Sequence, residues 1–148
     1  MDTTGATGFE IGRDGSSLVV GIDGSDTSWR ALHYAFGLAR RQSSVVMAVF
    51  AFTPMTSWDG IHAGVWYTAE ELADELRTAV VALSEEHHVA AEFLHAHRDP
   101  VVSLTEVASA CRADAIVVGA SKALSHKVVR SKAARTIRRS RCPVIVVP

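Results

Sequence analysis

Apolar runs alternate with amphipathic stretches along the chain. Five short runs are rich in Val, Ile, Ala or Phe and are apolar at successive positions, which is typical of strands buried on both faces. They cover residues 18–22, 45–52, 89–96, 115–118 and 143–147. The run at 89–96 is less apolar than the others, so we expect it at an edge of the sheet.

Four intervening segments carry apolar residues at spacings of three and four, which predicts helices with one buried face. We expect these helices over residues 27–41, 69–87, 100–111 and 132–139. The buried face of the first should consist of Trp29, Leu32, Ala35, Phe36 and Ala39.

Polar residues mark where three of these helices should begin. Residues 26–28 (Asp-Thr-Ser) supply N-cap chemistry for the first helix. Thr68 with Glu71 resembles a capping box for the second. Asp99 followed by Pro100 predicts a cap and a first helical position for the third.

Strands that alternate with helices predict an α/β domain whose parallel sheet is covered on both faces. Residues 53–66 contain Pro, Gly and two Trp, and we interpret them as a loop over the carboxyl edge of this sheet. Ligands of such sheets bind at that edge, where the strand order reverses. Asp23 and Gly119 follow the first and fourth strands, so the two residues flank one crevice if these strands are neighbours.

The composition narrows the class of protein. The chain has 148 residues, 48% of them hydrophobic, and a net charge of −1, which suits one domain with no general attraction to nucleic acid or membrane. No run approaches the roughly 18 apolar residues of a membrane span. Cys111 and Cys142 form no CxxC pair, so we interpret them as core thiols in a reducing cytoplasm. Residues 1–16 are predicted to be a mobile tail before a domain at 17–148.

The positive charge is concentrated near the end of the chain. Eight Lys or Arg and no acid lie between Lys122 and Arg141. Arg135, Arg138 and Arg139 share one face of the predicted last helix, which is most often a solvated face. No aromatic residues are interleaved with them, so the pattern does not favour nucleic-acid binding. The histidines are scattered without confirming carboxylates at ligand spacing, and we predict no metal site.

The segment from Ala115 to Pro148 has the order of a phosphate cradle. A strand ends at Gly119, a polar loop follows, and a basic helix begins at Lys132. Loop N–H groups and the positive end of a helix dipole both favour an anion at such a place. Two roles are open for Ser131: it binds a phosphate, or it is the N-cap of the last helix.

Two segments resemble the universal stress protein family. These are GIDGSDTSWRALHYAFGLA near the start and VGASKALSHKVVRSKAARTIRRSRCPVIVVP at the end. The resemblance extends over nearly the whole chain from Leu18. It implies a Rossmann-like, adenine nucleotide alpha hydrolase-like three-layer fold whose five parallel strands have the order 3-2-1-4-5. It also implies a cytoplasmic stress-response protein and homodimers paired through the last strand, here Val144–Val147.

Many members of this family bind ATP, and others do not. The nucleotide-binding type carries Gly-x2-Gly-x9-Gly-Ser/Thr. This chain keeps the first glycine as Gly119 and the hydroxyl as Ser131, but Lys122 and Arg130 stand at the other glycine positions. The spacing from Gly119 to Arg130 is also shorter. The two cations either block the cradle with their bulk or replace lost backbone contacts with charge-assisted hydrogen bonds.

The resemblance implies a site for ATP or another adenine nucleotide. Asp23 matches the family's ribose-contacting acid, although it could equally be a turn residue after the first strand. Phe50 falls near the position that packs on adenine. The predicted site consists of Gly21, Asp23, Ser25, Phe50, Val118, Gly119, Arg130, Ser131 and Lys132.

Three functions follow from these residues. The first is a stress-response protein that binds an adenine nucleotide and is not a dedicated enzyme. The second is a homodimeric interaction module without a nucleotide, which binds a protein partner that the sequence does not identify. The third is slow ATP hydrolysis, which the chain does not favour because it has no Walker lysine–serine motif and no base placed near Ser131.

Overall fold

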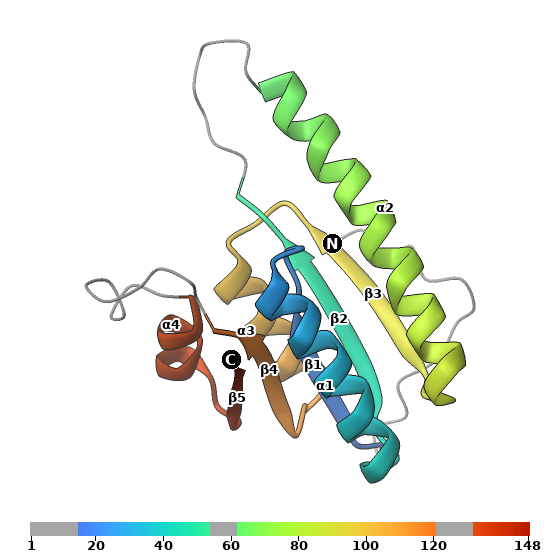
Figure 1. The fold of residues 1–148 in the computed structure, drawn as a ribbon. Coiled ribbons are helices and arrows are strands. Elements are labelled where there is room, and N and C mark those ends of the chain that lie inside the picture. The colour runs from blue at the N-terminus through green and yellow to red at the C-terminus, as the bar shows by residue number, and fades with distance from the viewer. Residues whose placement is uncertain (1–14, 54–61, 121–131) are drawn as a thin grey trace.

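The computed structural model describes residues 15–53, 62–120 and 132–148. In these residues five strands form one parallel sheet in the order β3-β2-β1-β4-β5 (Figure 1). The strands are β1 (Ser17–Gly21), β2 (Val45–Ala51), β3 (Ala91–Ala96), β4 (Ala115–Gly119) and β5 (Val144–Val147). The predicted fold and strand order are confirmed, and β3 lies at an edge as its less apolar sequence predicted.

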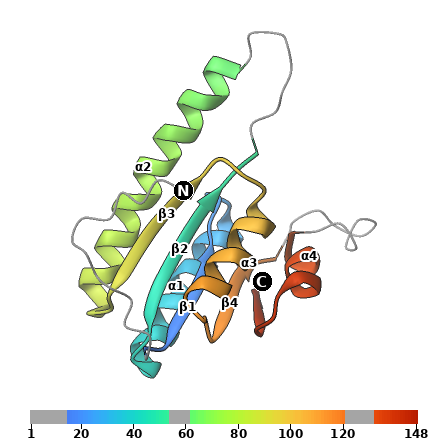
Figure 2. The same cartoon turned by 180° about the vertical axis from the view of Figure 1, so that it is seen from behind.

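Four helices cover the two faces of this sheet. They are α1 (Asp26–Gln42), α2 (His62–His87), α3 (Pro100–Ala110) and α4 (Lys132–Arg139). Helices α1 and α2 lie on one face (Figure 1), and α3, with α4 beside it, lies on the other (Figure 2). None of the helices in the described part of the chain has the length and apolar character that a bilayer crossing needs.

Each face of the sheet has its own hydrophobic core. Along β1, Leu18 and Val20 face α1 and α2, whereas Val19 faces α3, because successive side chains of a strand alternate. All three are almost fully buried. This burial on both faces explains why the strands are apolar at every position rather than at every second one.

The helix starts confirm one capping prediction and correct another. Asp99 caps α3, because its Oδ1 accepts hydrogen bonds from the N–H groups of Val101 and Val102 at 2.9 and 3.1 Å. The cap of α1 is Ser25, whose Oγ accepts from the Ser28 N–H at 3.3 Å. Asp26 is already the first helical residue, so the predicted cap within residues 26–28 is wrong by one position.

The predicted start of α2 is also wrong. The helix begins at His62 rather than Ala69, so residues 62–66 are helical and not part of a loop. Thr68 therefore lies inside the helix and is not its N-cap. The physical reason is that a continuous run of strong helix formers begins at Ala69, while Ala63 is followed by Gly64 and by residues of weaker propensity. Residues 54–61 of the predicted loop, and 1–14 of the predicted tail, lie outside the described residues.

The register places all five carboxyl ends at one edge of the sheet. The central strand β1 pairs with β2 through Leu18↔Val46 and with β4 through Leu18↔Ala115. The chain runs outward on one side as β2 and β3, and on the other as β4 and β5. The strand order therefore reverses between β1 and β4, which is where α/β sheets bind ligands.

Candidate functional site

Asp23 and Gly119 flank the point where the strand order reverses. Strands β1 and β4 are hydrogen-bonded neighbours, with Val20 opposite Val117. Asp23 lies in the turn after β1, and Gly119 is the last residue of β4. The sequence predicted that Asp23 and Gly119 flank one crevice if these strands are neighbours. The strands are neighbours, so the two residues lie on either side of the same point at the edge of the sheet.

A tight turn fixes the position of Asp23. Its Oδ1 accepts the Ser25 N–H at 2.9 Å, and its own N–H donates to Ser28 Oγ at 3.2 Å. Gly24 has a φ of 84°, a conformation that glycine adopts without cost, and a Cβ there would lie 2.9 Å from a methyl group of Leu72. Asp23 thus has the turn role that the sequence suggested.

The second carboxylate oxygen of Asp23 faces Lys132. The distance from Asp23 Oδ2 to Lys132 Nζ is 4.0 Å, and the two side chains are 46% and 59% exposed, so the pair is a weak one in solvent. Burial opposes ionisation of the Asp23 carboxyl, but hydrogen bonds from Ser25 and Ser28 and the charge of Lys132 outweigh it and lower its pKa. Asp23 is therefore an anion at neutral pH, with a side chain that is about half exposed.

Gly119 is required by a contact between β4 and α1. A Cβ at this position would lie 2.5 Å from the carbonyl carbon of Thr27 and 2.7 Å from its oxygen. Both atoms belong to the backbone, so no side-chain rotation relieves the overlap. The close approach sets the end of β4 against the first turn of α1, where helix N–H groups and the positive end of the dipole favour anions.

The remaining predicted residues differ in where they lie. Gly21 ends β1, and a Cβ there would lie 2.9 Å from Leu104. Phe50 is 4% exposed and packs against the rings of Phe52 and His95, with centroids 5.7 and 5.1 Å away. Val118 is buried in the core on the opposite face of the sheet.

The described part of the predicted site therefore divides into two groups. Five residues lie at or beside the ends of β1 and β4: Gly21, Asp23, Ser25, Gly119 and Lys132. Phe50 and Val118 are core residues on opposite faces of the sheet, so their side chains do not meet. Arg130 and Ser131, together with Lys122, lie outside the described residues.

An ion pair with α3 holds α4 in place. Arg135 Nη2 donates to Asp99 Oδ2 at 3.0 Å, and the two side chains are 39% and 35% exposed. The same carboxylate caps α3, so one residue orients both helices and helps to place Lys132 beside Asp23. Arg138 and Arg139 are exposed, as expected for a solvated face, whereas Arg135 is only partly exposed and is paired with Asp99.

Replacing Asp99 by alanine is expected to lower the free energy of unfolding by about 1 kcal/mol at pH 7, because the cap of α3 is lost. Burial opposes ionisation of Asp99, but hydrogen bonds from Val102 and Arg135 outweigh it and lower its pKa. The stabilisation by the charge is therefore present above the unfolded-state pKa and disappears as the pH falls through the folded-state pKa, below about pH 4.

Urea unfolding of wild type, Asp99→Ala and Asp99→Asn at pH 7 and pH 3 measures both effects. Asparagine keeps an acceptor for the cap but loses the charge that faces Arg135. The stability difference between wild type and Asp99→Asn should shrink at pH 3. A difference that is the same at both pH values would contradict the role of the charge.

Comparison with known proteins identifies the family. Residues 16–148 match the model of the universal stress protein family. The chain belongs to this family. It is 30% identical over 137 residues to universal stress protein MJ0531 of Methanocaldococcus jannaschii, a match that covers 88% of this chain and 80% of that protein.

Solved structures of universal stress proteins have the same fold. One, a universal stress protein in complex with cAMP, has a TM-score of 0.70 and 26% identity, and the match covers 90% of this chain and 96% of that one. Another, UspA of Lactobacillus plantarum, has a TM-score of 0.74 and 18% identity, with 90% and 97% covered. The family assignment made from the two end segments is therefore confirmed.

Sequence reasoning missed one group of polar side chains in this universal stress protein. His95 and His97 lie two residues apart at the end of β3, and Glu70 of α2 lies close to both. The His-x-His spacing on a strand was the available signal, because residues two apart point to the same side. The carboxylate comes from 25 residues earlier in the chain, and only the packing of α2 on β3 brings it close.

Proposed function

We propose that this universal stress protein binds ATP or another adenine nucleotide at the carboxyl edge of β1 and β4, as part of a cytoplasmic stress response. The observation that carries the proposal is the meeting of Asp23, Gly119 and Lys132 at that edge. The proposed role is binding and signalling, not catalysis.

The chemistry of these three residues matches the two ends of a nucleotide. The ionised Asp23 side chain is 46% exposed, so its carboxylate can accept hydrogen bonds from ribose hydroxyls. Lys132 supplies a cation for a phosphate, and the contact at Gly119 brings the N-terminus of α1 to the same edge. The relative in complex with cAMP supports an adenine nucleotide as the class of ligand.

The roles of the other predicted ligands stay predictions. Lys122, Arg130 and Ser131 would determine how a triphosphate is held, and they lie outside the described residues. Phe50 is buried, with His95 and Phe52 against it, so we expect any contact with adenine to be made by the edge of its ring.

Asp23→Asn is expected to weaken nucleotide binding about tenfold or more, since a hydrogen bond to a charged group contributes ~1.5–3 kcal/mol. Asparagine keeps an oxygen for the Ser25 N–H, so the turn and the fold should survive. Isothermal titration calorimetry with ATP and with AMP measures the affinity. Asp74→Asn is the matched control, because this aspartate is 77% exposed on α2 and pairs only locally with Arg77.

Two outcomes would change the assignment. Equal affinities of wild type and Asp23→Asn would place the nucleotide elsewhere. No binding of either nucleotide by the wild type would favour the alternative, a homodimeric interaction module.

One observation favours that alternative. β5 forms an edge of the sheet, and its Val146 is 39% exposed. A strand that pairs with a second copy through Val144–Val147 would have such an open edge. Native mass spectrometry records the oligomer and any co-purified nucleotide together.

A further inference from the structure

Three side chains of metal-ligating type converge beside the end of β3. They are Glu70 of α2, His95 of β3 and His97, which follows β3 directly. One ligand atom from each lies within 4.8 Å of the other two. Glu70 Oε1 and His97 Nε2 are 3.5 Å apart. We refer to these three residues as the His-His-Glu cluster.

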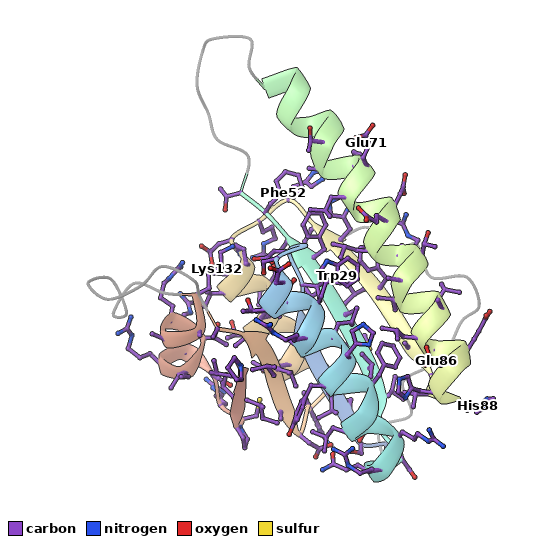
Figure 3. The ribbon with its side chains drawn as sticks, in the orientation of Figure 1. Trp29, Phe52, Glu71, Glu86, His88 and Lys132 are labelled. Carbon is purple, nitrogen blue, oxygen red and sulfur yellow. The ribbon has the colours of Figure 1, made fainter. Side chains whose placement is uncertain are left out.

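The fold holds both imidazoles against an aromatic surface. The rings of His95 and His97 meet edge to face with centroids 4.8 Å apart. His95 stacks on Phe50 at 5.1 Å, and His97 lies 4.9 Å from Phe52. Figure 3 shows Phe52 at the end of β2, facing the N-terminal half of α2, the helix that carries Glu70. Packing of this kind limits ring motion, which favours a preorganised pair of nitrogen ligands.

The separations are close to those that a tetrahedral metal site needs. Zinc binds histidine nitrogen and carboxylate oxygen at about 2.0–2.2 Å, so its ligand atoms lie about 3.3–3.6 Å apart. The pair formed by Glu70 and His97 already has this spacing. The side chains of Glu70 and His97 are 55% and 42% exposed, so small rotations of both can bring them onto an ion beside His95.

We propose that the His-His-Glu cluster binds one divalent transition metal ion, with Zn²⁺ as the best match to two imidazoles and one carboxylate. Three protein ligands leave a coordination position for water or another small ligand. A plain surface ion pair between protonated His97 and Glu70 would explain two of the three side chains. Stacking on Phe50 accounts for the position of the His95 ring, but neither contact alone requires that the ligand atoms of all three residues lie within 4.8 Å of one another.

The proposed metal site is separate from the proposed nucleotide site. Its residues belong to β3 and α2, whereas Asp23, Gly119 and Lys132 belong to the ends of β1 and β4 and the start of α4. The two sites share the carboxyl edge of the sheet but no ligand residue, although Phe50, which is predicted to contact adenine, also stacks on His95. The two proposals can therefore be tested independently, and a negative result for one does not contradict the other.

The test uses the full chain after removal of metal with a chelator and dialysis. Titration with Zn²⁺ by calorimetry should give one ion per chain for the wild type. Mutation of a residue that only orients a metal ligand typically weakens metal binding ~10–100-fold. Glu70→Gln and His97→Gln remove ligands themselves, so each should weaken Zn²⁺ binding by at least that factor. Both positions are exposed, so the variants should fold, and far-ultraviolet circular dichroism checks that they do.

Two control variants lie on the same helix or at its end. Glu71→Gln changes the exposed acid next to Glu70, and His88→Asn changes a histidine at the far end of α2 (Figure 3). His88 has a φ of 54°, which asparagine tolerates well. Both controls should keep the wild-type affinity for Zn²⁺.

Co²⁺ as a second probe identifies the ligand atoms. A visible spectrum of tetrahedral Co²⁺ without a thiolate charge-transfer band is expected, because the cluster contains no cysteine. A thiolate band would assign the metal to Cys111 or Cys142 and overturn the proposal. So would a wild type that binds no Zn²⁺, or Glu70→Gln and His97→Gln variants that bind as tightly as the controls. Zn²⁺ should also raise the Tm of the wild type more than that of Glu70→Gln.

Discussion

Gly119→Ala is expected to lower the free energy of unfolding by ~2–3 kcal/mol, near the upper end of the usual cost of overpacking. The added Cβ would lie 2.5 and 2.7 Å from the carbonyl carbon and oxygen of Thr27. Backbone atoms cannot rotate away as a side chain does, so either β4 or the first turn of α1 must shift. Urea unfolding followed by circular dichroism measures the loss.

Gly37→Ala provides the matched control for this change. Gly37 lies inside α1, and a Cβ there would meet only the end of the Arg41 side chain, at 3.6 Å. Because alanine has the higher helix propensity, this substitution should raise the stability by about 0.5–1 kcal/mol. A Gly119→Ala protein as stable as the wild type would contradict the close packing of β4 on α1.

Phe36→Ala is expected to have the largest effect on stability, a loss of about 3–5 kcal/mol. Phe36 is fully buried in the core between α1, α2 and the sheet, where its ring stacks on His87 at 5.8 Å. Removing the ring loses the free energy gained by burying it. It also leaves a cavity that the surrounding helices and strands fill only in part. The loss is a large fraction of the about 5–15 kcal/mol that stabilises a typical domain, so we expect a clearly lower urea midpoint and Tm.

Tyr34→Ala separates the effect of burial from that of changing any aromatic residue in α1. Tyr34 belongs to the same helix but is 41% exposed. Its replacement should change the free energy of unfolding by about 0.5 kcal/mol or less. Thermal and urea unfolding of both variants give the comparison, and similar losses for the two would show that Phe36 does not anchor the core.

The hydrophobic pattern predicted the elements of the fold because both faces of the sheet are covered. Strands buried on both sides leave continuous apolar runs, and helices packed on one side leave apolar residues three and four apart. The start of α2 could not be predicted in this way. Residues 62–68 have weak local propensity, and the capping signal at Thr68 stands inside the helix that it was expected to begin.

The order of the strands is not contained in the pattern of apolar residues. Any order of five buried strands would produce similar runs, and the order 3-2-1-4-5 came from the resemblance to universal stress proteins. The neighbourhood of Asp23 and Gly119 depends on that order. The resemblance matched Gly119 to the first glycine of the family's motif, but only the packing shows that the backbone of Thr27 leaves no room for a Cβ there.

The His-His-Glu cluster could not be predicted from sequence because its members join two elements. The two histidines have strand spacing, but Glu70 looks like any solvated acid on the exposed side of a helix. The contact depends on the angle at which α2 crosses β3, which no local pattern encodes. A site of this kind can be recognised only once the packing of α2 on β3 is known.

The central place of the first strand has a consequence for synthesis on the ribosome. β1 leaves the exit tunnel before the other four described strands, yet one of its two neighbours, β4, comes almost a hundred residues later. Until then the nascent chain has an open, apolar strand edge that can capture another polypeptide. We therefore expect the newly made protein to be more prone to aggregation before β4 is translated than afterwards.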